Sequence, residues 1–270
     1  MPPPRKTKIY ILGLKNNFRG VNLFESIKKE NLDVEVIWGF DYRLHKFSKN
    51  QFPDVKEEIF YGRQVSFGEL ACNLGHAMIM QKAFEEDIDL AVILEDDVHI
   101  LNFLEFKTVI ANLDMLNPAL VSLYFNERNI LSLSKKRKII SEKFHLKRNY
   151  CLSASTAAYA INKTALRKIN PFLGSRKHIS FQPDFPPYMG GLLTFFLLEN
   201  SFINLAEDSL SVVNDRKNLF RKDGMAKRRV SVYSGVFFIT YAHKLMNLKG
   251  YLMFFHGRKL SRMLKPQKRN

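Results

Sequence analysis

The first half of the chain alternates short apolar runs with amphipathic stretches. Lys8 to Leu14 and Val34 to Trp38 are apolar and rich in β-branched or aromatic residues, which is typical of buried strands. Leu90 to Leu94 is continuously apolar, as expected for a strand covered on both faces. The same pattern predicts further strands at Leu120 to Phe125 and Ala157 to Ile161.

Capping signals predict helices between these strands. Asn22, with Glu25 three residues later, predicts a helix that starts there and runs through Lys29. Ser66 and Glu69 form a second capping box. The apolar face of the helix that follows would consist of Leu70, Leu74, Ala77, Met78 and Phe84. Strands that alternate with helices predict an α/β fold with a mostly parallel sheet flanked by helices.

Two segments depart from this pattern. Lys135 to Arg148 is strongly basic and is expected to be a mobile loop. After about Asp215 the composition shifts to basic residues mixed with aromatics: residues 216–270 carry a net charge of +14, whereas residues 1–215 carry only +2. We therefore expect a main domain over residues 1–215 and a basic, aromatic-rich tail over residues 216–270.

The tail has apolar and basic residues at near-helical spacing, for example Phe237, Tyr241 and Lys244. This arrangement predicts a helical segment that associates with an anionic membrane surface. In the alternative interpretation, the aromatic residues complete the core and the charges face solvent.

The amino-acid composition limits which classes of protein this chain can belong to. Apolar residues make up 46% of the chain, which is enough for a sizeable core. Cys72 and Cys151 are far apart and form no C-x-x-C pair, which argues against a disulfide framework or a zinc site and suits a reducing cytosol. Ile9 to Leu14 is too short for a signal-peptide core, and no apolar run reaches the roughly 18 residues of a membrane span. We expect a cytoplasmic protein.

The most informative segment is Leu90 to Val98, in which an apolar strand leads directly into Glu95, Asp96 and Asp97. Three adjacent carboxylates repel one another, and a divalent cation such as Mn²⁺ or Mg²⁺ would relieve that repulsion and bridge to a diphosphate. Ligands of open α/β sheets bind just beyond the carboxyl ends of strands. A solvated turn that caps the next helix is the alternative interpretation.

Gly68 to His76 (GELACNLGH), a helix, and Ala91 to Val98 (AVILEDDV) together resemble glycosyltransferase family 25, which includes lipopolysaccharide and lipooligosaccharide galactosyltransferases. Trp38 to Arg43 and Thr156 to Leu166 resemble further family segments. The loop after the first strand departs from the family pattern, because Gly13 replaces an asparagine and the arginine is displaced to Arg19.

The resemblance implies a GT-A-like, Rossmann-like fold and an inverting transfer from a UDP-sugar. In that scheme Asp97 binds Mn²⁺ or Mg²⁺ directly, Glu95 reaches the metal's waters or the ribose, and Asp96 orients the pair. The donor-binding set would consist of Leu14, Asp41, Glu69, His76, Glu95 and Asp96. Asp41 could instead be a turn residue, Glu69 a capping partner and His76 a packing residue.

An inverting transferase needs a general base. We assign it to Asp184, in the aromatic- and proline-rich loop Phe181 to Tyr188, with Glu207 and Asp208 as the other candidates. A third metal ligand could be His243 or His256, although both also fit ordinary surface or core positions.

We therefore expect a transferase that moves galactose from UDP-galactose onto a lipid-linked lipooligosaccharide or lipopolysaccharide acceptor, at the inner face of the cytoplasmic membrane. UDP-glucose is the alternative donor. A metal-dependent nucleic-acid enzyme is the competitor from another class, but adjacent carboxylates are unusual for two-metal nucleases and no nucleic-acid-binding signature is present, so no nucleic acid is expected. A non-enzymatic membrane scaffold would leave the acidic triplet without a purpose.

Overall fold

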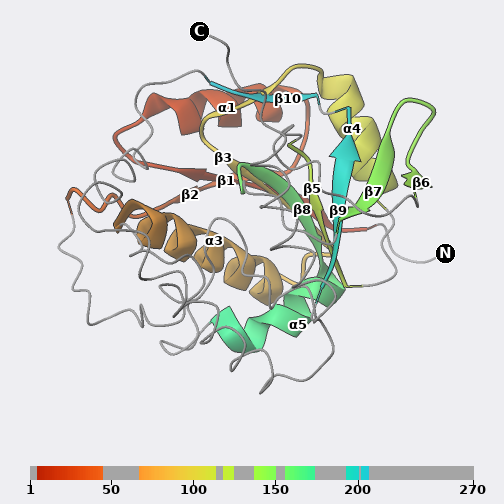
Figure 1. Cartoon of the computed structure of the whole chain (residues 1–270). Coiled ribbons are helices and arrows are strands. Elements are labelled where there is room, and N and C mark those ends of the chain that lie inside the picture. The colour runs from red at the N-terminus through yellow and green to blue at the C-terminus, as the bar shows by residue number, and fades with distance from the viewer. Residues whose placement is uncertain are drawn as a thin grey trace, which may run out of the picture.

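The computed structural model describes residues 5–44, 67–113, 118–124, 137–149, 156–173, 193–200 and 202–206 (Figure 1). Its centre is an eight-stranded sheet in the order β2-β1-β3-β8-β5-β9-β7-β6. Six strands point in one direction, and β7 and β8 are reversed. The strands are β1 (Thr7–Gly13), β2 (Val34–Trp38), β3 (Leu90–Glu95), β5 (Ala119–Ser122), β6 (Arg137–Ile139), β7 (His145–Asn149), β8 (Ala158–Asn162) and β9 (Thr194–Glu199). The predicted mixed α/β fold with a mostly parallel sheet is confirmed.

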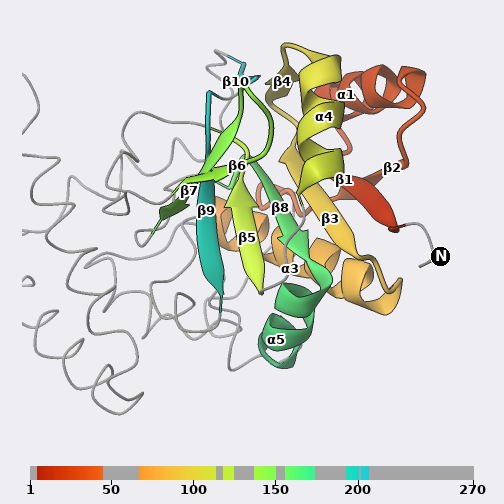
Figure 2. The ribbon, with the colours of Figure 1, turned by 90° about the vertical axis from the view of Figure 1, so that its right-hand side faces the viewer.

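Helices cover both faces of the sheet, so the molecule has three layers (Figures 1 and 2). α1 (Phe18–Lys29) and α4 (Phe103–Asn112) lie on one face, and α3 (Phe67–Glu85) and α5 (Lys163–Leu173) lie on the other. Alternation along β1 supplies both cores: Ile9 and Ile11 pack toward α1, and Tyr10 and Leu12 pack toward α3.

β1 is the point at which successive strands are added to opposite sides of the sheet. From β1 the chain passes through α1 to β2 on one side, and after α3 it enters β3 on the other side of β1. In open α/β sheets, ligands bind beyond the carboxyl ends of the strands at such a switch point. The antiparallel β8 pairs with β3, so β8 begins at the edge where β3 ends.

A second, two-stranded sheet lies directly beyond this edge. β4 (Val98–Ile100) follows the acidic triplet and pairs antiparallel with β10 (Ile203–Leu205). The N–H of Ala206 donates to the carbonyl oxygen of Asp97 at 2.8 Å. The backbone of the triplet is therefore held between the main sheet and this small sheet.

Two helix predictions need correction. α1 begins at Phe18 rather than after Asn22, because the side chain of Asn17 accepts the N–H of Arg19 and caps the helix. On α3, Met78 was predicted to face the core but is 41% exposed, whereas Met80 is fully buried. The helix is apolar on several sides, so sequence spacing selects no single face.

The prediction of a mobile basic loop at Lys135 to Arg148 is also wrong, because β6 and β7 form a hairpin there. Phe144 and Leu146 are buried, and Phe144 packs edge-to-face against Phe202 with ring centroids 5.5 Å apart. Lysines on strands at the margin of a sheet discourage pairing with other chains, so a high charge is compatible with a strand here.

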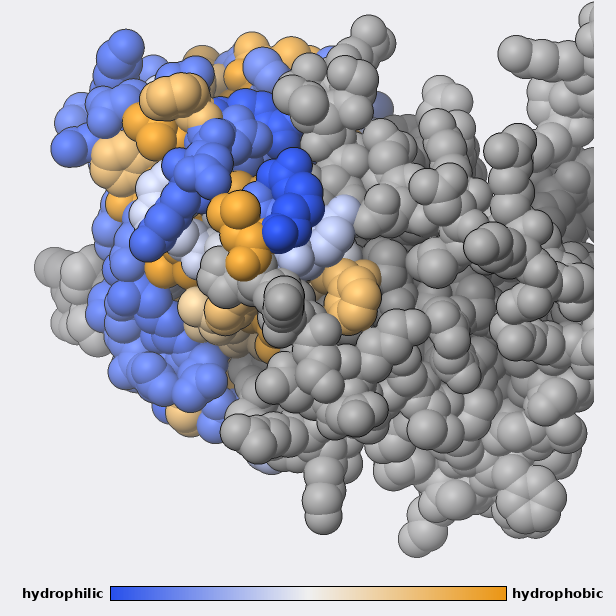
Figure 3. Space-filling view, turned by 90° about the vertical axis from the view of Figure 1, so that its left-hand side faces the viewer, coloured by the Kyte–Doolittle hydropathy of each residue, from blue (hydrophilic) through white to orange (hydrophobic). Residues whose placement is uncertain are grey.

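The described surface is largely hydrophilic with separate hydrophobic patches on the side seen in Figure 3. Exposed apolar side chains include Phe18 and Leu104. Among the described residues, no helix combines the length and apolar composition that a membrane span requires. The expected tail over residues 216–270 and its boundary at Asp215 lie outside the described residues.

Leu12 of β1 is packed between two glycines, and this contact sets how closely α3 approaches the sheet. A Cβ atom on Gly75 would lie 2.5 Å from Cδ1 and 3.0 Å from Cδ2 of Leu12. A Cβ atom on Gly39 would meet the same Cδ1 at 3.0 Å. Leu12 therefore has little room to retreat, and Gly75 allows the helix to carry the neighbouring His76 close to the sheet.

We predict that Gly75→Ala lowers the free energy of unfolding by about 1 to 3 kcal/mol, because overpacking outweighs the better helix propensity of alanine. Urea denaturation followed by circular dichroism measures the change. Gly20→Ala in α1 is the matched control, since its Cβ would have only ordinary contacts at 3.6 Å or more. Equal stability of Gly75→Ala and wild type would contradict this account of the packing.

Candidate functional site

The acidic triplet lies at the switch point, beyond the end of a buried strand. Residues 90–94 of β3 are completely buried, and Glu95 is the last residue of the strand. The N–H of Glu95 donates to the carbonyl oxygen of Ala157 at 2.7 Å, which ties the end of β3 to the start of β8. Three adjacent carboxylates thus lie at the end of a strand that is buried from water, so each negative charge needs a nearby partner that stabilises it.

The negative charge of Asp96 is stabilised by side chains at the start of α1. Its Oδ1 accepts from Arg19 at 3.2 Å, and its Oδ2 accepts from the amide of Asn17 at 3.2 Å. The backbone N–H of Leu14 also favours the charged form. Burial nevertheless raises the pKa of Asp96 above its usual value, opposed by Arg19 and reinforced by Glu95.

Glu95 is held from the opposite side by α3 and by the residue that precedes β8. Its Oε1 accepts from the Thr156 hydroxyl at 2.7 Å and lies 3.3 Å from Nε2 of His76. The other ring nitrogen of His76 lies 3.0 Å from the Tyr159 hydroxyl. His76 and Tyr159 are almost fully buried, so this chain of contacts fixes the side of the site next to the sheet.

Asp97 lacks comparable compensation. Its Oδ1 is buried and has no hydrogen-bond partner among the described residues. Burial, followed by the negative charges of Glu95 and Asp96, raises the pKa of Asp97 to about 7. A buried carboxylate beside two others is the kind of group that a cation stabilises most.

The donor atoms of this cluster fit a hard divalent cation. Carboxylate oxygens are the preferred ligands of Mg²⁺ and Mn²⁺, and the orphaned oxygen of Asp97 is the atom best suited to bind one. Glu95 is already oriented by Thr156 and His76, so it could contribute without a large rearrangement. The neighbouring Arg19 and Asn17 supply donors that a phosphate oxygen could also use.

The other predicted donor-binding residues occupy the same edge of the sheet or its flank. Asp41 follows β2 and is nearly buried, but its carboxylate accepts from the backbone N–H of Arg43 at 3.0 Å and pairs with the guanidinium of Arg43 at 2.6 Å. It therefore has the contacts of a turn residue. Leu14 follows β1 beside Asp96. Glu69 lies in the first turn of α3, and its side chain is outside the described set.

The three candidate general bases and the two candidate histidine ligands fall outside the part of the chain that the structure describes. The bases are Asp184, Glu207 and Asp208, and the histidines are His243 and His256. Glu207 and Asp208 follow directly in sequence after Ala206, which is bonded to the backbone of Asp97.

Sequence reasoning missed four residues that contact the triplet or its partners. Asn17 and Arg19 bind Asp96, Thr156 binds Glu95, and Tyr159 binds His76. Arg19 had been noted only as displaced from the family position, yet it still reaches the triplet. Thr156 and Tyr159 carried a signal, since both belong to the segment that resembles the family.

Comparison with known proteins gives one broad match and several distant ones. The sequence model of glycosyltransferase family 25 (LPS biosynthesis protein) matches residues 6–184. No curated protein is similar enough in sequence to count as a match. Among solved structures, A197 from STIV is 13% identical, with 73% of this chain and 83% of that chain covered and a TM-score of 0.39.

A second solved structure is a glycosyltransferase involved in the glycosylation of the major capsid of PBCV-1. It is also 13% identical, with 62% of this chain and 65% of that chain covered and a TM-score of 0.33. At these scores neither structural likeness carries weight for function or substrate.

The raised pKa of Asp97 predicts a stability that depends on pH in metal-free protein. The folded protein keeps a proton on Asp97 up to about pH 7, whereas the unfolded chain releases it near pH 4. Stability from this group is therefore lost as the pH rises from about 4 to about 7, by roughly 4 kcal/mol at most. Urea denaturation in a chelator across this range measures the effect.

Asp97→Asn removes the titrating group and serves as the comparison. We expect the variant to be more stable than wild type at pH 8 and to show a weaker pH dependence between pH 4 and 7. Identical pH profiles for the two proteins would contradict the proposed cause.

Proposed function

Because this chain belongs to glycosyltransferase family 25, we propose that it is an inverting, metal-dependent hexosyltransferase that uses a UDP-sugar. The family match makes the chain a glycosyltransferase associated with LPS biosynthesis, so it requires a sugar donor and an acceptor. The donor we propose is UDP-galactose, and the acceptor is the terminal sugar of a lipid-linked lipooligosaccharide or lipopolysaccharide. UDP-glucose remains the alternative donor.

The observation that carries the proposal is the buried, orphaned oxygen of Asp97. It lies beside Glu95 and Asp96 at the switch point of the sheet, and its pKa is raised to about 7. A site that keeps three carboxylates together without a cation is unfavourable, whereas a bound Mn²⁺ or Mg²⁺ would favour all three in their charged form.

When bound, the cation would act as a Lewis acid that neutralises charge on the departing diphosphate. Asp97 would hold it directly, and Glu95 would bind its waters or the ribose of the donor. Asp96 is held by Arg19 and Asn17, so its role would be to fix the turn that carries both neighbours. His76 and Thr156 would keep the carboxylate of Glu95 in one orientation.

In the transfer itself, an acceptor hydroxyl attacks the anomeric carbon while the bond to the UDP oxygen breaks. The proton of that hydroxyl passes to a general base, for which we propose Asp184. Glu207 and Asp208 are the alternatives, because they follow Ala206, whose N–H donates to the carbonyl oxygen of Asp97.

A calorimetric titration with UDP and Mn²⁺ tests the proposal with two contrasting variants. We expect wild-type protein to bind UDP only when Mn²⁺ is present. Asp97→Ala should remain folded but lose metal-dependent UDP binding and transfer. Asp184→Asn should bind UDP like wild type yet lose about 10²- to 10⁴-fold in turnover, which is the usual contribution of a general base.

Near-normal turnover of Asp97→Ala would rule out the metal assignment. Loss of UDP binding in Asp184→Asn would make that residue structural or donor-binding. Metal-dependent binding of nucleic acid without UDP binding would favour the competing class of enzyme. A screen of UDP-sugars for slow hydrolysis without acceptor identifies the donor.

We also propose that the basic tail holds the enzyme on an anionic membrane, where a lipid-linked acceptor would be found. Each lysine or arginine near such a surface contributes roughly 1 kcal/mol, and residues 216–270 hold 15 of them. Full-length protein should sediment with vesicles that contain anionic lipid, whereas a chain truncated after Asp215 should not. Equal sedimentation of both forms, or sedimentation independent of salt, would contradict this role.

A further inference from the structure

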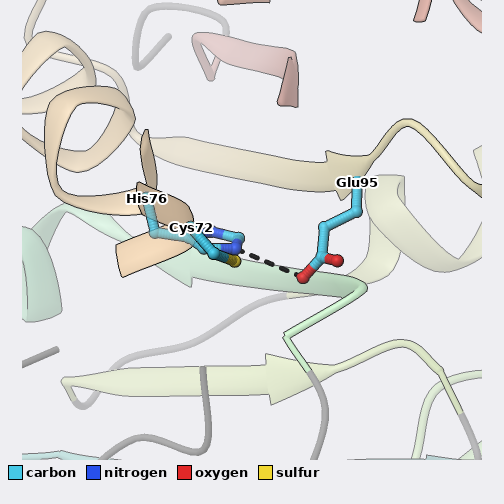
Figure 4. Close-up of side chains that lie close together, drawn as sticks. All are labelled: Cys72, His76 and Glu95. Atoms are coloured by element: carbon cyan, nitrogen blue, oxygen red, sulfur yellow. Dashed lines mark hydrogen bonds and ion pairs between the residues drawn. The ribbon is translucent and has the colours of Figure 1, made fainter. Parts of the chain in front are cut away.

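Three potential metal ligands meet on the side of the acidic triplet that faces α3. Cys72 and His76 are four residues apart and project from the same side of the helix, and Glu95 reaches them from the end of β3 (Figure 4). The sulfur, the imidazole nitrogen and the carboxylate oxygen all lie within 4.8 Å of one another. Although the cysteine spacing argued against a zinc site, we propose that Cys72, His76 and Glu95 form a site for a divalent cation of the Zn²⁺ class, distinct from the cation proposed at Asp97.

The distances are compatible with one shared ion. Ligand atoms about 2.0 to 2.3 Å from a tetrahedral zinc ion lie roughly 3.5 Å from each other. Nε2 of His76 is already 3.3 Å from Oε1 of Glu95. The sulfur of Cys72 is the atom that has to approach, by a movement on the order of 1 Å, which a change of side-chain torsion can supply.

The surroundings of His76 prepare it for this role. Its Nδ1 lies 3.0 Å from the hydroxyl of the buried Tyr159. In the metal-free protein Nε2–H donates to Glu95 and Nδ1 accepts from the Tyr159 hydroxyl. When an ion binds, the ring proton would move to Nδ1, which would then donate to the hydroxyl oxygen and leave the lone pair of Nε2 for the ion, as a metal-binding histidine requires. Thr156 fixes Glu95 in the same way, because its hydroxyl donates to Oε1 at 2.7 Å.

Charge also favours such an ion. A thiolate and a carboxylate with a neutral imidazole would balance a divalent cation, so the occupied site would be neutral in a largely buried environment. Binding would release the thiol proton to solvent. Three protein ligands leave a fourth position open for water, and the partial exposure of Cys72 and Glu95 provides access.

The chemical type of the ligand atoms distinguishes this site from the cation site proposed at Asp97. Asp97 offers only oxygen and suits Mg²⁺ or Mn²⁺, whereas Cys72 and His76 offer sulfur and nitrogen and suit Zn²⁺ or Co²⁺. Glu95 borders both sites, so an ion on Cys72 would fix the position of the carboxylate. The proposal concerns metal binding and does not depend on the transferase reaction.

Cobalt substitution tests the site, because a thiolate bound to Co²⁺ gives a charge-transfer band in the near ultraviolet. The full chain is first stripped of metal with a chelator and then titrated with Co²⁺. We expect a saturable band in wild type that is abolished by added Zn²⁺. The band should be lost in Cys72→Ser and kept in Cys151→Ser, the matched variant of the only other cysteine.

Two further variants keep the test decisive if Cys72→Ser fails to fold. Tyr159→Phe retains all three ligands but removes the partner of Nδ1, so it should weaken Co²⁺ binding by about 10- to 100-fold. Asp97→Asn should keep the cobalt band while losing Mn²⁺-dependent UDP binding, which separates failure of this site from failure of the proposed function.

Absence of the band in folded wild-type protein would overturn the proposal and leave His76 with a purely hydrogen-bonding role toward Glu95. A band that survives Cys72→Ser, or that is lost in Cys151→Ser, would overturn it as well. Co²⁺ affinity of Tyr159→Phe equal to that of wild type would overturn the role given to the Tyr159 hydroxyl in orienting His76.

Discussion

Mutual repulsion among three carboxylates at the end of a desolvated strand is the constraint on which the site depends. Asp96 is compensated by Arg19 and Asn17 from α1, and Glu95 by His76 and Thr156. Asp97 keeps a buried oxygen without a partner among the described residues. The fold thus satisfies two members of the cluster with its own side chains and leaves the third dependent on a proton or a cation.

The strand order is what brings these partners together. Because β2 and β3 lie on opposite sides of β1, the connecting helices α1 and α3 lie on opposite faces of the sheet. Each helix supplies a residue to one side of the triplet. The antiparallel β8 begins where β3 ends, so Thr156 arrives at the same edge. Close packing of Leu12 between Gly39 and Gly75 lets α3 approach the sheet, and the adjacent His76 reaches Glu95.

Several elements followed directly from local pattern. β2 has the predicted bounds, β3 extends one residue further than predicted, and β1 and β8 are each shifted by one residue at both ends. These strands are short, apolar and bounded by polar residues, so their local signal is strong. The β6–β7 hairpin was missed because its lysines and arginines obscured the alternation of Phe144 and Leu146 with exposed residues. The start of α1 was missed because Asn22 offered a competing capping signal four residues beyond its first residue.

The sequence by itself determined the α/β class, the position of the triplet after a buried strand and the resemblance to glycosyltransferase family 25, since all of these reside in contiguous residues. Only the tertiary structure decided which side chains compensate each carboxylate. Asn17 and Arg19 are more than 75 residues from Asp96, and Thr156 is 61 residues from Glu95. Local spacing carries no information about such pairs, because strand order and helix packing, rather than distance along the chain, determine which side chains meet.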